Sequence, residues 1–182
     1  PSKGGSVEIN ADTFQMNNAA FKSVVGKTGI ARDVFLNADR IDIKGSNFFS
    51  ATNGSGQGAD IYMSASDSIQ LDKAKMYTQR ALTSKQDKVS EAGSLYLEAP
   101  KINITNRSRV FTSVMSGARG VGGNVVMDAD QIEITKDSLL VSDIFGQGKG
   151  GAMDLNANSV LEVNNSVLST MSKTSSKRSK NG

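Results

Sequence analysis

Apolar and polar residues alternate in short runs along this chain, and the same run occurs six times. Each copy opens with an aliphatic residue, then another two positions later, then an alanine two positions after that. The alanines follow one another at spacings of 27, 27, 34, 30 and 28 residues. They are Ala11, Ala38, Ala65, Ala99, Ala129 and Ala157. Alternation over four to six residues is the signature of a strand with one buried face. Each copy is therefore predicted to begin with a short β-strand.

Two more alternating segments follow in each copy. The second is an apolar pair such as Ile41 and Ile43, and the third places an apolar residue two positions before a hydroxyl, as in Phe48 and Ser50. Three short strands in roughly 30 residues, with no helical periodicity, do not fit a propeller blade of about 40 to 45 residues and four strands. They fit one coil of an all-β, right-handed, single-stranded parallel β-helix. The predicted domain spans the whole chain, with coils at roughly 4–32, 33–58, 59–92, 93–122, 123–150 and 151–182.

Stacking of the coils puts equivalent residues about 4.8 Å apart. The second aliphatic residue of each copy is then expected to form one continuous column inside the solenoid. That column consists of Ile9, Leu36, Met63, Leu97, Met127 and Leu155. Insertions are expected where they disturb no ladder, and the variable stretch indeed always follows the third strand, longest from Gln79 to Gly93.

Composition agrees with short strands joined by many turns. Only 37% of residues are hydrophobic, while glycine numbers 18 and proline 2. The chain has no cysteine and no histidine, so disulfides and thiolate metal sites are excluded and the commonest general base is missing. No apolar run approaches membrane-spanning length, so no membrane insertion is expected. No signal peptide opens the chain, and we expect it to be a segment of a longer protein.

The glycine-rich turns that lead into strands resemble a known family. The segments 54–65 and 146–157, Gly-Ser-Gly-Gln-Gly-Ala-Asp-Ile-Tyr-Met-Ser-Ala and Gly-Gln-Gly-Lys-Gly-Gly-Ala-Met-Asp-Leu-Asn-Ala, are similar to repeats of filamentous-haemagglutinin-like exoproteins. The resemblance covers essentially the whole chain. It implies an extracellular β-helical shaft of a bacterial two-partner secretion adhesin, exported through an outer-membrane partner and used in adhesion, aggregation or biofilm formation. The amino-terminal secretion domain of that family, with its Asn-Pro motifs, is not in this sequence.

Outward positions of stacked repeats form rows, and two of these rows carry aromatic residues. The first-strand row includes Phe35, Tyr62 and Tyr96, and the third-strand row includes Phe49, Tyr77 and Phe111. One hypothesis is a glycan platform, in which ring faces stack on sugars and neighbouring Asn, Asp and Glu side chains bind hydroxyls. The other is structural, because stacked rings stabilise a parallel sheet or pack beneath a loop or a neighbouring shaft.

Polar residues recur at the corners, and basic residues recur in the variable loops. The corner residues, such as Asp72 and Asp130, favour turn formation, with calcium binding as the alternative. The basic residues predict a cationic edge that attracts anionic polysaccharide, with a solvated edge as the alternative and no specific nucleic acid expected. The candidate anion contacts are Arg80, Lys85, Lys88, Arg119 and Lys149.

Function is predicted as that of a structural and adhesive shaft at the cell surface, with surface glycans or neighbouring shafts as partners. No catalytic residue, metal or cofactor is predicted. The alternatives are a polysaccharide-degrading β-helix enzyme, for which Glu98 and Asp128 would supply the carboxylates, and a segment of a phage tail spike.

Overall fold

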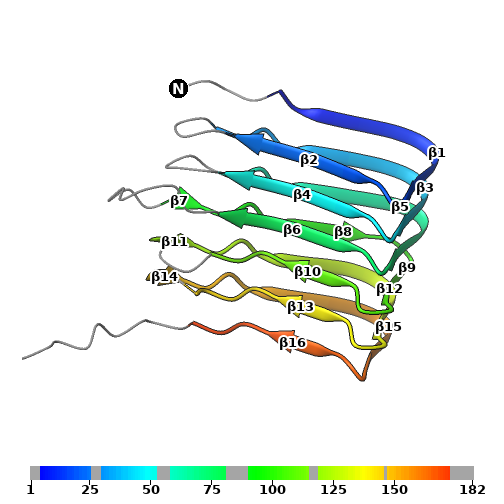
Figure 1. Cartoon of the computed structure of the whole chain (residues 1–182). Helices are drawn as coiled ribbons and strands as arrows, with labels where there is room; N and C mark the ends of the chain where they lie inside the picture. Colours follow the sequence, from blue (N-terminus) through cyan, green and yellow to red (C-terminus); the bar gives the residue numbers. More distant parts are fainter. Residues whose placement is uncertain are drawn as a thin grey trace, which may run out of the picture.

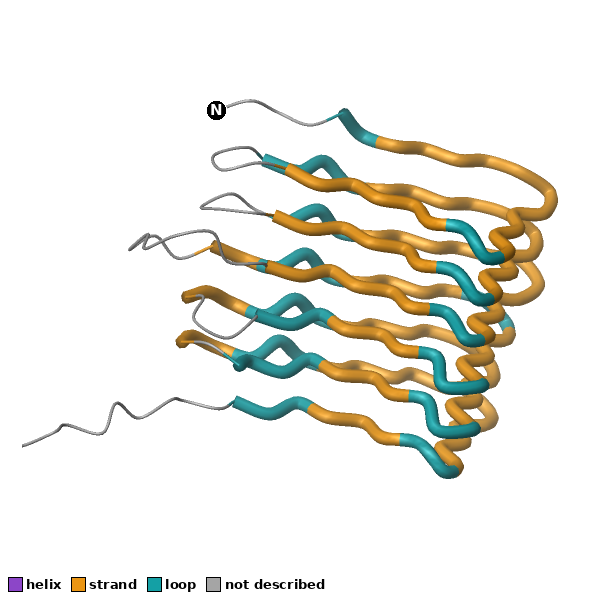
Figure 2. The backbone as a smooth tube through the Cα atoms, viewed as in Figure 1, coloured by secondary structure: helices purple, strands orange, loops and turns teal. Residues whose placement is uncertain are grey.

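The chain folds as a parallel β-solenoid of about five turns, with three parallel sheets and no helix among the described residues (Figures 1 and 2). The six repeats form six stacked rungs, and the chain makes about five turns around the solenoid axis between the first rung and the last. The predicted parallel β-helix is thus confirmed. The computed structural model describes residues 5–25, 30–52, 58–80, 90–114, 119–145 and 147–172.

The first sheet is built from long strands that are stacked in sequence order. They are β1 (Val7–Asn17), β3 (Val34–Lys44), β5 (Ile61–Asp72), β8 (Leu95–Glu98) with β9 (Lys101–Thr105), β12 (Val125–Thr135) and β15 (Met153–Asn164). The first and second predicted strands of a repeat are therefore one continuous strand in most copies, which corrects the expectation of three separate short strands. Only the fourth copy is divided, at Pro100, because proline has no N–H to donate to a ladder.

The second sheet consists of the predicted third strands. They are β2 (Ala20–Val25), β4 (Asn47–Thr52), β6 (Lys75–Arg80), β10 (Arg109–Phe111), β13 (Leu139–Val141) and β16 (Val167–Ser169). A small third sheet lies within the stretches that were expected to be variable loops. Its strands are β7 (Ser90–Glu91), β11 (Arg119–Val121) and β14 (Gln147–Lys149).

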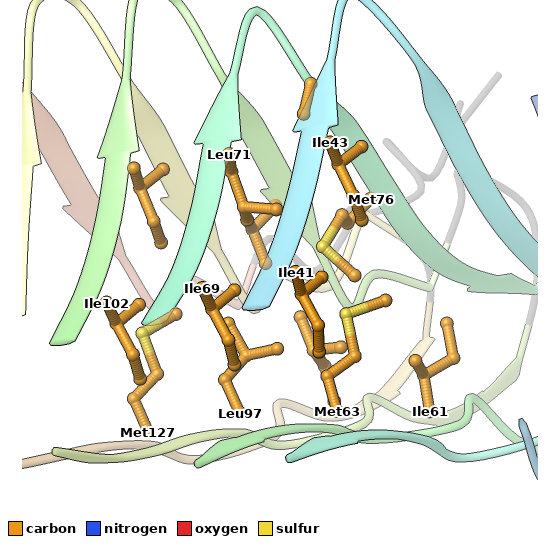
Figure 3. Close-up of a cluster of buried hydrophobic side chains, with 14 of the residues drawn as sticks. Ile41, Ile43, Ile61, Met63, Ile69, Leu71, Met76, Leu97, Ile102 and Met127 are labelled. Atoms are coloured by element: carbon orange, nitrogen blue, oxygen red, sulfur yellow. The ribbon is translucent and has the colours of Figure 1, made fainter. Parts of the chain in front are cut away.

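The predicted aliphatic column is continuous. Cα pairing joins Ile9 to Leu36, Leu36 to Met63, Met63 to Leu97, Leu97 to Met127 and Met127 to Leu155. The column faces the second half of the long strands across the interior (Figure 3). Side chains of the inner rungs, such as Leu36 and Ile69, are fully buried, because each is covered by a rung on both sides.

Two kinds of corner turn the chain. After Ala38 the register of β3 against β5 shifts by one residue, so the alanine column marks the bend within the long strand. At the end of each long strand one or two residues adopt a left-handed conformation, for example Asn18 (φ 50°), Gly45 (φ 57°) and Asn165 (φ 48°). Asparagine and glycine tolerate this conformation best.

A buried serine follows these left-handed residues in several rungs. Ser46 Oγ donates to Lys44 O at 2.8 Å and accepts the N–H of Ala19, in the preceding rung, at 3.1 Å. Ser108 Oγ likewise donates to Thr105 O at 2.6 Å and accepts the N–H of Ala74 at 3.0 Å. Each hydroxyl thus satisfies backbone groups that the corner removes from the sheet.

The glycine at the entry to the first strand is required by close approach of backbones. A Cβ atom added to Gly123 would lie 1.9 Å from the carbonyl oxygen of Gly93, whereas one added to Gly5 would meet nothing within 4 Å. The stacked backbones thus leave no room for a Cβ atom at Gly93, Gly123 or Gly151, whereas the second and third rungs carry Arg32 and Ala59 at this position.

We expect Gly123→Ala to lower the free energy of unfolding by about 1 to 3 kcal/mol, because the clashing atom is backbone and the ladder resists displacement. Urea unfolding followed by circular dichroism measures this change. Gly5→Ala is the matched control and should change stability by less than about 0.5 kcal/mol. Equal stability of the two variants would contradict the proposed packing.

Candidate ligand-contact surfaces

The first predicted aromatic row is a stacked ladder on the outer face of the long strands. The ring centroids of Phe35 and Tyr62 lie 5.0 Å apart with 9° between the planes, and those of Tyr62 and Tyr96 lie 4.6 Å apart with 4° between the planes. The arrangement follows from the register, since Phe35 pairs with Tyr62 and Tyr62 with Tyr96.

This geometry limits how the ladder could hold a sugar. Rings that are nearly parallel at these distances cover the faces of their neighbours, so sugar C–H groups reach mainly ring edges along the ladder. The ladder ends after Tyr96, whose partner in the next rung is Val126. Of the two faces of the Tyr96 ring, Tyr62 covers one, and the face toward Val126 is therefore not covered by another aromatic ring.

A hollow of about 250 Å³ lies at this end of the ladder. Its lining comes from β5, β8 and β12 and includes Tyr96 and Val126 together with Ser64, Glu98 and Asp128. Aromatic, hydroxyl and carboxylate groups thus meet on one wall of the solenoid. Asp128 also accepts a hydrogen bond from Asn156 Nδ2 at 2.7 Å.

The second aromatic row lies on the outer face of the second sheet and is less regular. Tyr77 and Phe111 are stacked, with centroids 5.3 Å apart and 3° between the planes. Phe49 meets Tyr77 edge-on at 6.3 Å and 67°. All three rings are half-buried. The glycan contact of both rows stays a prediction.

A polar ladder that the sequence did not indicate borders the first aromatic row. Each side chain accepts the backbone N–H of the next rung: Asp33 from Asp60 at 3.0 Å, Asp60 from Ser94 at 2.7 Å, Ser94 from Asn124 at 3.1 Å, and Asn124 from Ala152 at 2.8 Å. The signal is an Asp, Ser or Asn one position before the first strand in five of the six copies, with Ala152 in the last. Its residue types vary too much for the motif to be recognised in the sequence.

This ladder alters the chemistry of Tyr62. Its hydroxyl donates to Asp60 Oδ2 at 3.3 Å. Burial, followed by the negative charge of Asp60, raises the pKa of Tyr62 to about 12 from an ordinary value of 10.0. Burial also raises the pKa of Tyr77.

The polar corners form hydrogen-bonded ladders. Asn106 Nδ2 donates to Asp72 Oδ1 and Asn165 Nδ2 donates to Asp137 Oδ1, each at 2.9 Å. Asp130 accepts from Asn158 Nδ2 at 3.0 Å. Among the described residues, no group of three or more acidic side chains could hold a metal ion. The geometry favours the turn interpretation of these residues.

The structure describes only some of the residues of the predicted cationic edge. Lys85 and Lys88 lie outside the described residues, and Arg80 and Arg119 are described only as backbone in β6 and β11. Lys149 is exposed at the end of β14, paired with Val121. The anion contact therefore stays a prediction.

Comparisons with family models, with curated proteins and with solved structures return no match to this chain. Within the part of the chain that the structure describes, no helix is long and apolar enough to cross a membrane.

We expect the phenol of Tyr62 to titrate at about pH 12. Because the folded state raises this pKa, it binds the proton more tightly than the unfolded state does. The resulting stability is complete below pH 10.0 and is lost as the pH rises toward 12. Tyrosinate absorbance of the wild type minus that of Tyr62→Phe measures the midpoint. A difference curve centred near pH 10.0 would contradict the burial and the Asp60 contact.

Proposed function

We propose that this chain is a segment of the extracellular shaft of a bacterial surface protein that mediates adhesion, aggregation or biofilm formation. The observation that carries the proposal is the register, in which every rung pairs only with the rung before it and the rung after it. A body of this kind lengthens along one axis when coils are added, because each coil contacts only its neighbours. Such rods suit the presentation of binding groups far from the cell.

The finer proposal is that the protein is a filamentous-haemagglutinin-like exoprotein of the two-partner secretion type. It is supported by the glycine-rich turns before the first strands and by the resemblance of segments 54–65 and 146–157 to that family. On this proposal an outer-membrane partner exports the full-length protein, which acts at the cell surface or outside the cell.

Surface glycans are the proposed ligand class, and the hollow beside Tyr96 is the proposed contact. It combines an aromatic face with the hydroxyl of Ser64 and the carboxylates of Glu98 and Asp128. Hydroxyl and carboxylate oxygens accept hydrogen bonds from sugar hydroxyls, while the ring offers an apolar surface.

We expect Tyr96→Ala to weaken retention of the protein on a glycan array by about 5-fold, the equivalent of one aromatic contact worth about 1 kcal/mol. Tyr62→Ala should also weaken retention, since it removes the ring that supports Tyr96. Gln70→Ala is the control, because Gln70 is exposed on the second half of β5. Unchanged retention of both tyrosine variants would eliminate this contact, and absence of any retained glycan would count against adhesion through sugars.

A polysaccharide-degrading enzyme is the alternative, because Glu98 and Asp128 occupy paired positions on neighbouring rungs. Glycoside hydrolysis uses two carboxylates about 5 to 9.5 Å apart. The residues that line the hollow come only from three strands of one sheet, so a substrate chain would be held from one side. We therefore favour binding over catalysis.

We expect no release of reducing sugar from a panel of bacterial and plant polysaccharides incubated with the protein. The measurement includes the variant Glu98→Gln. Robust sugar release that this substitution abolishes would overturn the ranking and make the chain an enzyme.

A further inference from the structure

Charge is sorted between two outer faces of the solenoid. The first, which we call the acidic face, comprises the outward rows of the long strands that begin at Ser6, Glu8 and Asn10. No lysine or arginine occupies these rows. Its exposed acids are Glu8, Glu98, Asp128 and Asp154, with Asp33 and Asp60 half-buried at its border.

The second, which we call the basic face, comprises the outward rows of the second sheet that begin at Ala20 and Lys22. Its exposed charged residues are Lys22, Lys75 and Arg109, and neither row contains an acid. The sequence as a whole has a net charge of only +3, so this separation is a property of the fold and not of the composition.

Both faces place like charges on adjacent rungs. Glu98 pairs with Asp128 in the first sheet, and Lys75 pairs with Arg109 in the second. Like charges at paired positions repel each other, and an opposite charge between them relieves the repulsion. Within the described ranges, the ion pairs involve other positions: Arg40–Asp67, Lys101–Glu133 and Arg107–Asp137. None of the described residues therefore forms an ion pair with the paired like charges, which are Glu98, Asp128, Lys75 and Arg109.

The aromatic ladders of the two faces match in height. Phe35, Tyr62 and Tyr96 come from the second, third and fourth repeats, and so do Phe49, Tyr77 and Phe111, in the same order. Figures 1 and 2 show the two sheets on opposite sides of the core, so the two faces point away from each other. One molecule can therefore present both faces to different neighbours.

We propose that a second copy of this chain is the partner of these faces. The acidic face of one molecule packs against the basic face of the next, with the solenoids side by side, parallel and at equal height. Ladder then meets ladder. The Lys75–Arg109 pair lies one rung, about 4.8 Å, from the level of Glu98 and Asp128, a distance that long basic side chains span. Because the two surfaces differ, the contact is heterologous and repeats from molecule to molecule.

The size of the faces predicts weak association between single chains. Six rungs span about 24 Å, and five strand residues span about 17 Å, which gives roughly 400 Å² per partner. A stable dimer buries about 800 Å² per partner. A longer shaft repeats the contact along its length, so its affinity rises steeply by multivalency.

The test compares charge-reversed variants of the whole chain by sedimentation equilibrium at roughly 0.1 to 1 mM, the range in which a small interface is populated. One variant carries Glu98→Lys and Asp128→Lys, and the other carries Lys75→Glu and Arg109→Glu. We expect the wild type to associate, less so at high salt. The association constant of each reversed variant should be about one tenth of the wild-type value or lower, because like charges then face each other.

An equimolar mixture of the two reversed variants should regain association, since every contact between the two different variants again joins opposite charges. This rescue separates lost complementarity from lost folding, and circular dichroism checks each variant. The matched controls change charge equally away from both faces. They are Lys44→Glu with Lys73→Glu, and Asp12→Lys with Glu162→Lys, and both should behave as the wild type.

Three results would overturn the proposal. The first is a monomeric wild type over the whole concentration range, and the second is a mixture that fails to associate. The third is association that neither reversal weakens, which would point to contact elsewhere, for example at the exposed Leu161 and Leu168 of the last rung. The inference does not depend on adhesion: a monomeric chain that still binds glycans would refute it and leave the proposed shaft intact.

Discussion

Parallel, in-register pairing between successive rungs is the constraint on which the rest of this structure depends. It places Ile9, Leu36 and Met63 in one column, and it makes the core a stack of similar side chains instead of a packed globule. A shift of one residue would turn every inward side chain to the outside. The register is protected by the apolar alternation of each long strand and by the buried hydroxyls and left-handed residues at the corners.

The same constraint also imposes a cost at polar positions. Any side chain that is repeated at one position meets its own kind one rung away, and like charges there repel each other. Along much of the surface the chain avoids this by alternating acceptor and donor, as in Asp72 with Asn106 and Asp137 with Asn165. The pairs Glu98–Asp128 on the acidic face and Lys75–Arg109 on the basic face depart from that pattern.

Stacking of the rungs changes which parts of the aromatic side chains a binding partner can reach. In the sequence they are candidates for sugar binding through ring faces. In the solenoid the parallel pairing turns those faces toward each other, so that Tyr62 is covered by Phe35 on one side and Tyr96 on the other. What the ladder offers to a partner is its edges and its end, and the chemistry of the neighbouring rows decides which partner suits them.

The sequence by itself determined the repeat, the parallel β-helix, the inner aliphatic column and the aromatic outer rows, because in-register stacking converts a period in sequence directly into contact in space. It did not determine that the first two strands are continuous, since a bend at an alanine does not interrupt backbone pairing. Nor did it locate β7, β11 and β14, whose two- or three-residue pairings carry no alternation. The Asp33 and Asp60 ladder and the ring orientation depend on the distance between rungs. Only the tertiary structure could decide them, because that distance brings together residues about 30 positions apart.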